Sequence, residues 1–373
     1  MKRLALILCL GLLSAVMMSL GAQAAEPLKL GVLFPMTGAN APYGQNALRG
    51  LKLAHEARPQ ALGRPVELVV VDNKSDKVEA TNGANRLIQH DKVAAIIGPL
   101  ASSTSLAAAP VCEAAGVPMV SPWATNPLVT QGKKYAFRVC FIDPFQGQVG
   151  ANFAAKNLKA KTAALMVDIA QDYCVGIASY CEKAFKELGG QVLIKTSYSS
   201  GDQDFSAQLL AIKAKNPDII YVPAYFAEGA LIARQAREMG LKQPMLGGDA
   251  SQAAELIKIG GPAVEGLSFT THFDENGVTT PSGQSFVKAY RARHHEAPDS
   301  CSALSYDAYN VLLDAMEKAK SASPAAVAAA LEKTKDFPGV TGVLSLVEHN
   351  AVKPAVILQV KDGKFVYVAT VNP

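Results

Sequence analysis

From residue 28 onward, short apolar runs alternate with stretches in which apolar residues recur every three or four positions. The short runs predict strands at 28–34, 66–72, 93–97 and 118–120. The periodic stretches predict helices at 43–57, 77–90 and 103–115. This alternation is typical of a parallel sheet covered by helices, which binds ligands at the carboxyl ends of its strands.

A second series of the same kind begins after Pro144. Its expected helices lie at 148–158, 175–188, 205–215, 228–239 and 250–259, and its strands at 162–167, 191–197, 218–222 and 245–246. Residues 282–333 have a mainly helical pattern, and short strands follow, the last at 364–371. The sequence therefore predicts an α/β fold of two lobes, each with a parallel sheet, and a ligand cleft between them.

The first 25 residues predict export. Lys2 and Arg3 precede an apolar run from residue 4 to residue 20, and Ala22-Gln23-Ala24 follows it. A run of about 17 residues is short for a membrane span, and the Ala-x-Ala site after it favours a cleaved signal peptide. We expect cleavage after Ala24 and a periplasmic mature protein, which loses Cys9 with the signal.

Removal of residues 1–24 from 373 leaves 349, enough for two domains, with 34 basic against 32 acidic side chains. This balance gives no reason to expect a nucleic-acid partner. The compartment permits disulfides, but the mature chain has an odd number of cysteines and no C-x-x-C motif. They are Cys112, Cys140, Cys174, Cys181 and Cys301. A Cys112–Cys140 bridge is preferred, because both residues fall in one predicted lobe.

Motifs of common enzymes are missing from the sequence. There is no G-x-G-x-x-G, H-E-x-x-H or G-x-S-x-G, and Gly132-Lys133-Lys134 lacks the Ser or Thr of a phosphate-binding loop. The six histidines are scattered. We therefore expect no cofactor, no metal and no catalytic residue, although a Ser/His/Asp set assembled only in space stays an open alternative.

Two loops carry candidate binding chemistry. Residues 98–105 follow a predicted strand and contain Ser102, Ser103, Thr104 and Ser105 at the start of a helix. Free amides, the positive end of the helix dipole and clustered hydroxyls suit a carboxylate ligand. The alternative is an ordinary helix cap, since Ser and Thr are preferred there. Residues 121–127 offer hydroxyls and an aromatic side chain one βα unit later.

These two loops read G-P-L-A-S-S-T at 98–104 and S-P-W-A-T-N-P at 121–127. Together they closely resemble the leucine/isoleucine/valine-binding protein family of periplasmic receptors. Further matching segments extend the resemblance over nearly the whole mature chain: 30–38, 43–44, 203–206, 234–240 and 305–309.

The resemblance implies how an amino acid would be held. Ser102 and Thr125 would bind the carboxylate, with Leu100 in the same first loop as a further contact. The main-chain carbonyl of Trp123, the Thr125 hydroxyl and Asp249 would receive the ammonium group, since a desolvated ammonium requires a negative partner. The alternative for Asp249 is a cap on the helix expected from Ala250.

Aromatic closure residues also follow from the resemblance. They are Tyr43 on the first lobe and Tyr173 and Tyr225 on the second, with Tyr306 a weaker match. A tyrosine combines rigid apolar area with one polar tip, yet each could equally be core packing.

Two departures from the family bear on specificity and stability. Trp123 stands where relatives commonly carry a small residue, which leaves an aliphatic and an aromatic ligand both open. The disulfide often found near the first ligand loop would need cysteines near Lys74 and Ala101, and neither position has one.

The family implies a hinged receptor with three chain crossings between its lobes. Lobe 1 is expected to hold residues 25–143 and 273–347, and lobe 2 residues 144–272 and 348–373. The implied function is to capture an amino acid, with an aliphatic one favoured, as a monomer, and to deliver it to a membrane permease with ATPase subunits. A sensory receptor of the same fold for an amide or aromatic acid is the alternative, and an enzyme ranks third.

Overall fold

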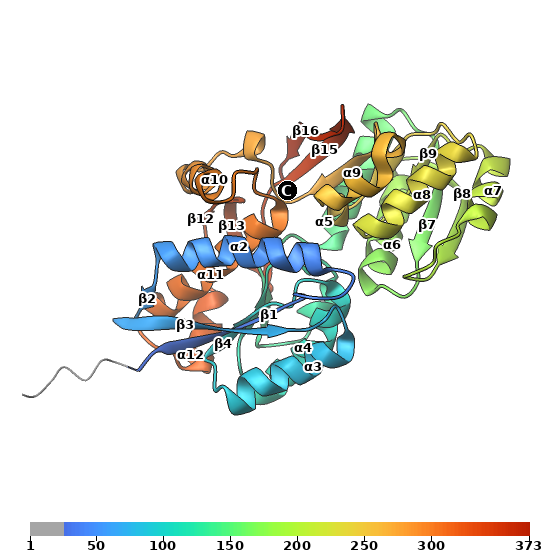
Figure 1. The fold of residues 1–373 in the computed structure, drawn as a ribbon. Coiled ribbons are helices and arrows are strands. Elements are labelled where there is room, and N and C mark those ends of the chain that lie inside the picture. Colours follow the sequence, from blue (N-terminus) through green and yellow to red (C-terminus); the bar gives the residue numbers. More distant parts are fainter. Residues whose placement is uncertain (1–25) are drawn as a thin grey trace, which may run out of the picture.

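The computed structural model describes residues 26–373 as two α/β halves, each built on its own sheet (Figure 1). The expected signal peptide, with its cleavage site after Ala24, lies outside the described residues. Within residues 26–373, no helix combines the length and apolarity that a membrane span requires. We call the halves lobe 1 and lobe 2 after the order of their sheets in the chain.

Lobe 1 contains a six-stranded sheet in the order β2-β3-β1-β4-β5-β6, parallel except at β2. Its strands are β1 (Leu28–Phe34), β2 (Gln60–Ala61), β3 (Arg64–Asp72), β4 (Ala95–Ile97), β5 (Met119–Ser121) and β6 (Ala136–Arg138). Its helices are α2 (Ala41–Ala57), α3 (Lys77–Asn85), α4 (Ser102–Ala115), α10 (Pro281–His294), α11 (Ser300–Ala319) and α12 (Pro324–Leu331). Helix α11 packs along α2, so late sequence completes the first half.

Lobe 2 contains a seven-stranded sheet in the order β16-β15-β11-β10-β9-β7-β8, in which β15 and β16 run antiparallel to their neighbours. Its strands are β7 (Thr162–Asp168), β8 (Gln191–Tyr198), β9 (Ile219–Tyr221), β10 (Met245–Gly247), β11 (Ser268–Thr271), β15 (Ala355–Lys361) and β16 (Lys364–Val371). Its helices are α5 (Asp143–Asn152), α6 (Asp172–Glu187), α7 (Ser206–Lys215), α8 (Phe226–Glu238) and α9 (Ala254–Gly260).

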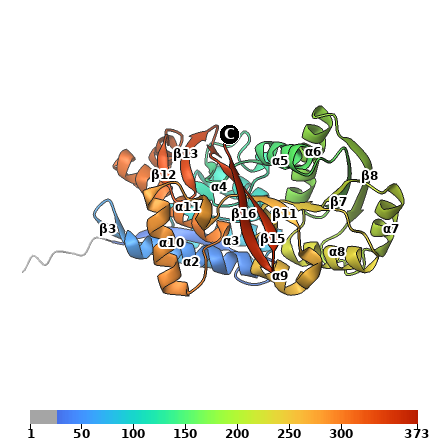
Figure 2. The same ribbon diagram turned by 90° about the horizontal axis from the view of Figure 1, so that it is seen from above.

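The chain passes between the lobes three times. The first crossing joins β6 to α5 (residues 139–142), the second leads from β11 towards α10 (272–280), and the third precedes β15 (353–354). A small sheet leads into the third crossing; its strands are β12 (Phe337–Gly339), β13 (Gly342–Val347) and β14 (Asn350–Val352). Seen from above, β15 and β16 lie between the two halves (Figure 2).

The predicted fold class is confirmed, and the starts of two helices, α5 and α9, differ from the prediction by four residues or more. Helix α5 begins at Asp143 rather than at residue 148, because Pro144 occupies the first helical turn, where its missing N–H is not needed. The helix expected at residue 250 begins at Ala254, after a short 3-10 turn over Asp249–Ser251.

The Cys112–Cys140 bridge was a wrong prediction. All five described cysteines are buried free thiols. Cys112 belongs to the core on one face of the first sheet, whereas Cys140 belongs to the core on the other face and donates to the Ala124 carbonyl at 3.3 Å. Two residues of one lobe can lie on opposite sides of its sheet, and a disulfide forms only between cysteines that are close together.

Candidate ligand-binding site

A small cavity lies where the two lobes meet. Its wall is formed by lobe 1 residues from the two predicted loops and by lobe 2 residues facing them: Ala101, Ser102, Trp123, Tyr173, Tyr225, Asp249 and Ala250. The space left free by protein atoms is about 170 Å³, including the part that opens to solvent. Five of the eight predicted binding residues therefore line one cavity.

The first loop presents a helix start to the cavity. The N-cap of α4 is Ala101, which makes no side-chain cap, and Ser102 is the first helical residue. Ser102 Oγ accepts from the Asn126 N–H at 3.2 Å, so its own proton stays free to be donated. The cap alternative for these hydroxyls is not supported, since neither Ser103 nor Thr104 caps the helix either. The amides of the first turn have no partner within the helix.

The second loop is held in shape by a buried arginine. Arg138, at the end of β6, is fully buried and donates to the carbonyls of Ala124 and Asn126, the second at 2.8 Å. The loop consequently places Trp123 in the cavity wall. Thr125 lies behind the wall, and its buried hydroxyl has no hydrogen-bond partner among the described residues.

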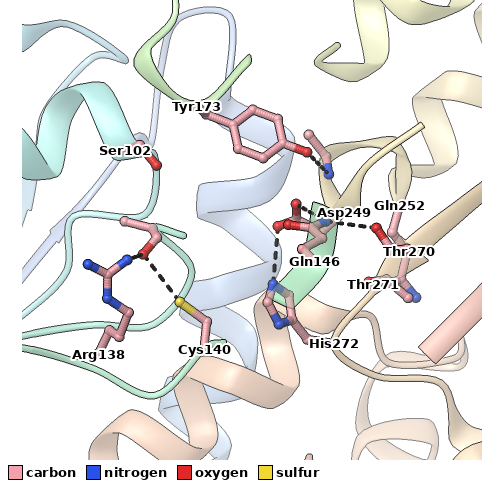
Figure 3. A network of polar contacts seen from close by, with 12 residues as sticks. Ser102, Arg138, Cys140, Gln146, Tyr173, Asp249, Gln252, Thr270, Thr271 and His272 are labelled. Atoms are coloured by element: carbon pink, nitrogen blue, oxygen red, sulfur yellow. Dashed lines mark hydrogen bonds and ion pairs between the residues drawn. The ribbon is translucent and has the colours of Figure 1, made fainter. Parts of the chain in front are cut away.

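Asp249 forms the opposite wall and is anchored by two side chains of lobe 2 and the second crossing (Figure 3). Its Oδ1 accepts from Gln146 Nε2 at 2.8 Å, and its Oδ2 lies 3.1 Å from His272 Nε2. Gln146 also donates to Thr270 at 2.9 Å. Asp249 does not cap α9, whose N-cap is Ala253, so the cap alternative is wrong.

The predicted tyrosines gather beside Asp249. The Ala250 N–H donates to the Tyr173 hydroxyl at 3.5 Å. A Cβ on Gly248 would stand only 2.2 Å from the same hydroxyl oxygen, so glycine is required there. Tyr43 crosses from lobe 1, donates to the Ala250 carbonyl and accepts from the Phe226 N–H at 3.1 Å. Its ring lies 4.7 Å from that of Trp123. Tyr43 thus joins the lobes directly behind the cavity.

Two candidates lie away from the cavity. Leu100 is buried in the core, and it is its neighbour Ala101 that lines the wall. Tyr306 packs against Phe286, 5.0 Å between ring centres, in a separate core cluster. Both side chains pack in the core and do not line the cavity wall.

Further contacts hold the lobes together at the cavity mouth. Ser103 Oγ accepts from the Asp172 N–H at 3.1 Å, and Asn126 Nδ2 donates to the Asp172 carbonyl at 2.9 Å. Lys77 pairs with the Asp172 carboxylate at 3.0 Å. The described arrangement is therefore a closed one.

Sequence reasoning missed four polar residues around the site, namely Arg138, Asp143, Gln146 and His272. All are buried. Arg138, Asp143 and His272 lie at or beside chain crossings. A charged or imidazole side chain at such a position was the signal in the sequence that could have indicated them. Within residues 26–373, no group of three or more His, Cys, Asp or Glu side chains has metal-binding geometry.

Asp143 is the most strongly perturbed acid near the cavity. Its two carboxyl oxygens are buried without a hydrogen-bond partner in the described chain. Burial raises the pKa of Asp143 to about 7, and the charge of Asp249 adds to the increase. The Thr125 hydroxyl and Arg138 favour the ionised form but do not offset burial.

The comparisons with known proteins agree with this geometry. The model of the periplasmic binding protein family matches residues 27–364. A leucine-, isoleucine-, valine-, threonine- and alanine-binding protein of Pseudomonas aeruginosa is 31% identical over 336 residues, 88% of each chain. The leucine binding protein LivK of Thermotoga maritima has a TM-score of 0.91 and 47% identity, over 93% of this chain and 99% of that one.

LivJ, the branched-chain amino acid transporter substrate binding protein of Streptococcus pneumoniae, was solved in complex with isoleucine. It gives a TM-score of 0.87 at 34% identity, over 93% of this chain and 100% of its own. A cavity between two α/β lobes defines a class of solute-binding receptors. This chain belongs to the periplasmic binding protein family, and its resemblance to the leucine/isoleucine/valine-binding proteins is confirmed.

Replacement of Asp143 by Asn should change how stability depends on pH. Between pH 4 and 7, the folded wild type holds a proton on Asp143 that the unfolded chain has lost, so stability falls as pH rises through this window. The variant lacks this titration. From pH 4 to pH 7.5, the free energy of unfolding of the variant should therefore rise by about 2–4 kcal/mol relative to that of the wild type.

Urea unfolding of both proteins across this pH range measures the difference. His272, whose pKa burial lowers to about 4, acts in the opposite sense but is present in both proteins. Parallel stability curves would show that Asp143 is not buried in this way.

Proposed function

We propose that this chain is the substrate-binding component of an ABC transporter, which captures an aliphatic amino acid between its lobes and delivers it to a membrane permease. The observation that carries the proposal is the polarity of the cavity. One wall offers helix amides and the Ser102 hydroxyl, and the other presents the Asp249 carboxylate. An α-amino acid has the matching pair of charges.

In this proposal the ligand carboxylate lies against the start of α4, where Ser102 donates to it. The Thr125 hydroxyl, which makes no hydrogen bond within residues 26–373, turns towards the ligand. The ammonium group faces Asp249 and donates to the carbonyl of Trp123. Tyr173 and Tyr225 cover the ligand from lobe 2, and Tyr43 supports them from lobe 1.

Cavity size favours an aliphatic side chain over an aromatic one. The free space is only about 170 Å³ even with the part that opens to solvent, so the closed cavity leaves little room for a large ring. In this proposal Trp123, which forms part of the wall, limits the space for the ligand side chain.

The transport role rests on the relatives, since LivJ is named as the substrate binding protein of a branched-chain amino acid transporter. We further propose export with cleavage after Ala24, a monomeric receptor without enzymatic activity, and the lobe division at residues 143/144, 272/273 and 347/348. In this division, ligand binding selects the closed form of a three-crossing hinge.

Thermal unfolding of the mature chain with single amino acids tests the proposed function. A ligand at 100 times its dissociation constant stabilises by about 2.7 kcal/mol. Leucine, isoleucine, valine or alanine should raise the melting temperature, and phenylalanine should not. No shift with any amino acid would contradict the proposal. A shift with amides or aromatic acids alone would favour a sensory receptor.

Closure itself is tested at Gly176 in α6. A Cβ on this residue would stand 2.8 Å from Asp143 Oδ2 and 3.0 Å from Asn126 Nδ2. The contact with Asn126 forms between the lobes, and Asp143 lies at the end of the first crossing, where α5 begins. Gly176→Ala should therefore strain the closed form, and overpacking of about 1–3 kcal/mol lowers ligand affinity about 5- to 150-fold.

Gly229→Ala in α8 is the matched control, because its Cβ would meet neighbours only at 3.6 Å, an ordinary contact. Alanine favours a helix more than glycine does, so neither ligand-free variant should lose stability. Calorimetric titration with the ligand from the screen compares them. Equal affinities for the two variants would mean that binding does not need this lobe contact.

A further inference from the structure

His272 stands at the point where all three chain crossings meet. It is the first residue after β11, and its side chain is fully buried. From the first crossing, the Phe141 ring lies against the imidazole, 3.8 Å between ring centres. From the third crossing, Lys353 Nζ donates to the His272 carbonyl at 3.0 Å.

The same imidazole contacts the acid in the cavity wall. Its Nε2 lies 3.1 Å from Asp249 Oδ2 and points towards it (Figure 3). One residue therefore touches the proposed ammonium-binding group with its side chain, and residues from the other two crossings hold its ring and its carbonyl.

The surroundings keep His272 neutral. Burial lowers its pKa to about 4, and the nearby Lys353 charge adds to the decrease, whereas Asp249 opposes it. Because a carboxylate only accepts hydrogen bonds, a neutral His272 must carry its proton on Nε2 to satisfy Asp249. A neutral donor orients the carboxylate without cancelling its charge, which stays available to a ligand cation.

We propose that His272 is a positioning residue that couples the orientation of the Asp249 carboxylate to the hinge. Rotation of the lobes changes how the three crossings sit against one another. It therefore displaces His272, whose imidazole packs against Phe141 and whose carbonyl is held by Lys353. The carboxylate is then aligned for an ammonium group only when the hinge is closed. This inference rests on the proposed function, because it assigns His272 a role towards the same ligand.

Two substitutions separate positioning from packing. Gln places an amide N–H about where His272 Nε2 lies, whereas Asn is equally polar but too short to reach Asp249. His272→Asn should lower amino-acid affinity about 10- to 100-fold, the effect of losing a hydrogen bond to a charged group. His272→Gln should restore most of it, and both ligand-free variants should unfold at similar temperatures.

The chain has one tryptophan, and it lines the cavity, so its fluorescence follows ligand binding in every variant. His272→Asn is also combined with Asp249→Asn and titrated to millimolar ligand. If His272 acts through Asp249, its substitution should have less than about a threefold effect in that background.

Equal affinities of the Asn and Gln variants would overturn the inference, as would an equal effect of His272→Asn with and without Asp249. Failure of the wild type to bind any amino acid would instead contradict the proposed function.

Discussion

The rest of the site depends on one desolvated negative charge, the carboxylate of Asp249 in the wall of the cavity. Removing a carboxylate from water costs several kcal/mol unless partners replace its hydration. The protein supplies two neutral partners, Gln146 and His272, which donate to different oxygens. These contacts hold the group in place but leave its charge uncompensated. The wall therefore has a strong preference for a cation at this point.

The opposite wall offers the complementary chemistry on a different lobe. Helix amides and the Ser102 hydroxyl stabilise an anion without a full positive charge nearby. A zwitterion gains from both walls only when the lobes are closed, so its binding favours that form. The exposed Lys77–Asp172 pair contributes little to closure, because surface ion pairs are weak. Tyr43, buried between the lobes, is the stronger protein contact.

Much of the fold could be predicted from local patterns, since strand and helix periodicities depend on neighbouring residues. The loops at Ser102 and Trp123 could be predicted because clustered hydroxyls and loop-forming prolines are local signals. Asp249 was predicted from the family resemblance. The side chains that hold the site could not be found this way. Gln146 and His272 are 126 residues apart in the sequence, and only the folded chain brings both to Asp249. Arg138 is buried because loops from other parts of the sequence pack around it. The Cys112–Cys140 prediction failed for the same reason.

Calorimetry with leucine and 4-methylpentanoic acid, its analogue without the amine, tests the central claim most directly. Wild-type protein is compared with Asp249→Asn, which removes the charge at nearly constant shape. We expect leucine to bind the variant about 30-fold to several thousandfold more weakly, because its ammonium loses a buried charged partner. The analogue brings no ammonium group to pair with Asp249, so it should bind the variant at least as well as the wild type. Equal leucine affinity in the two proteins would contradict the role of Asp249.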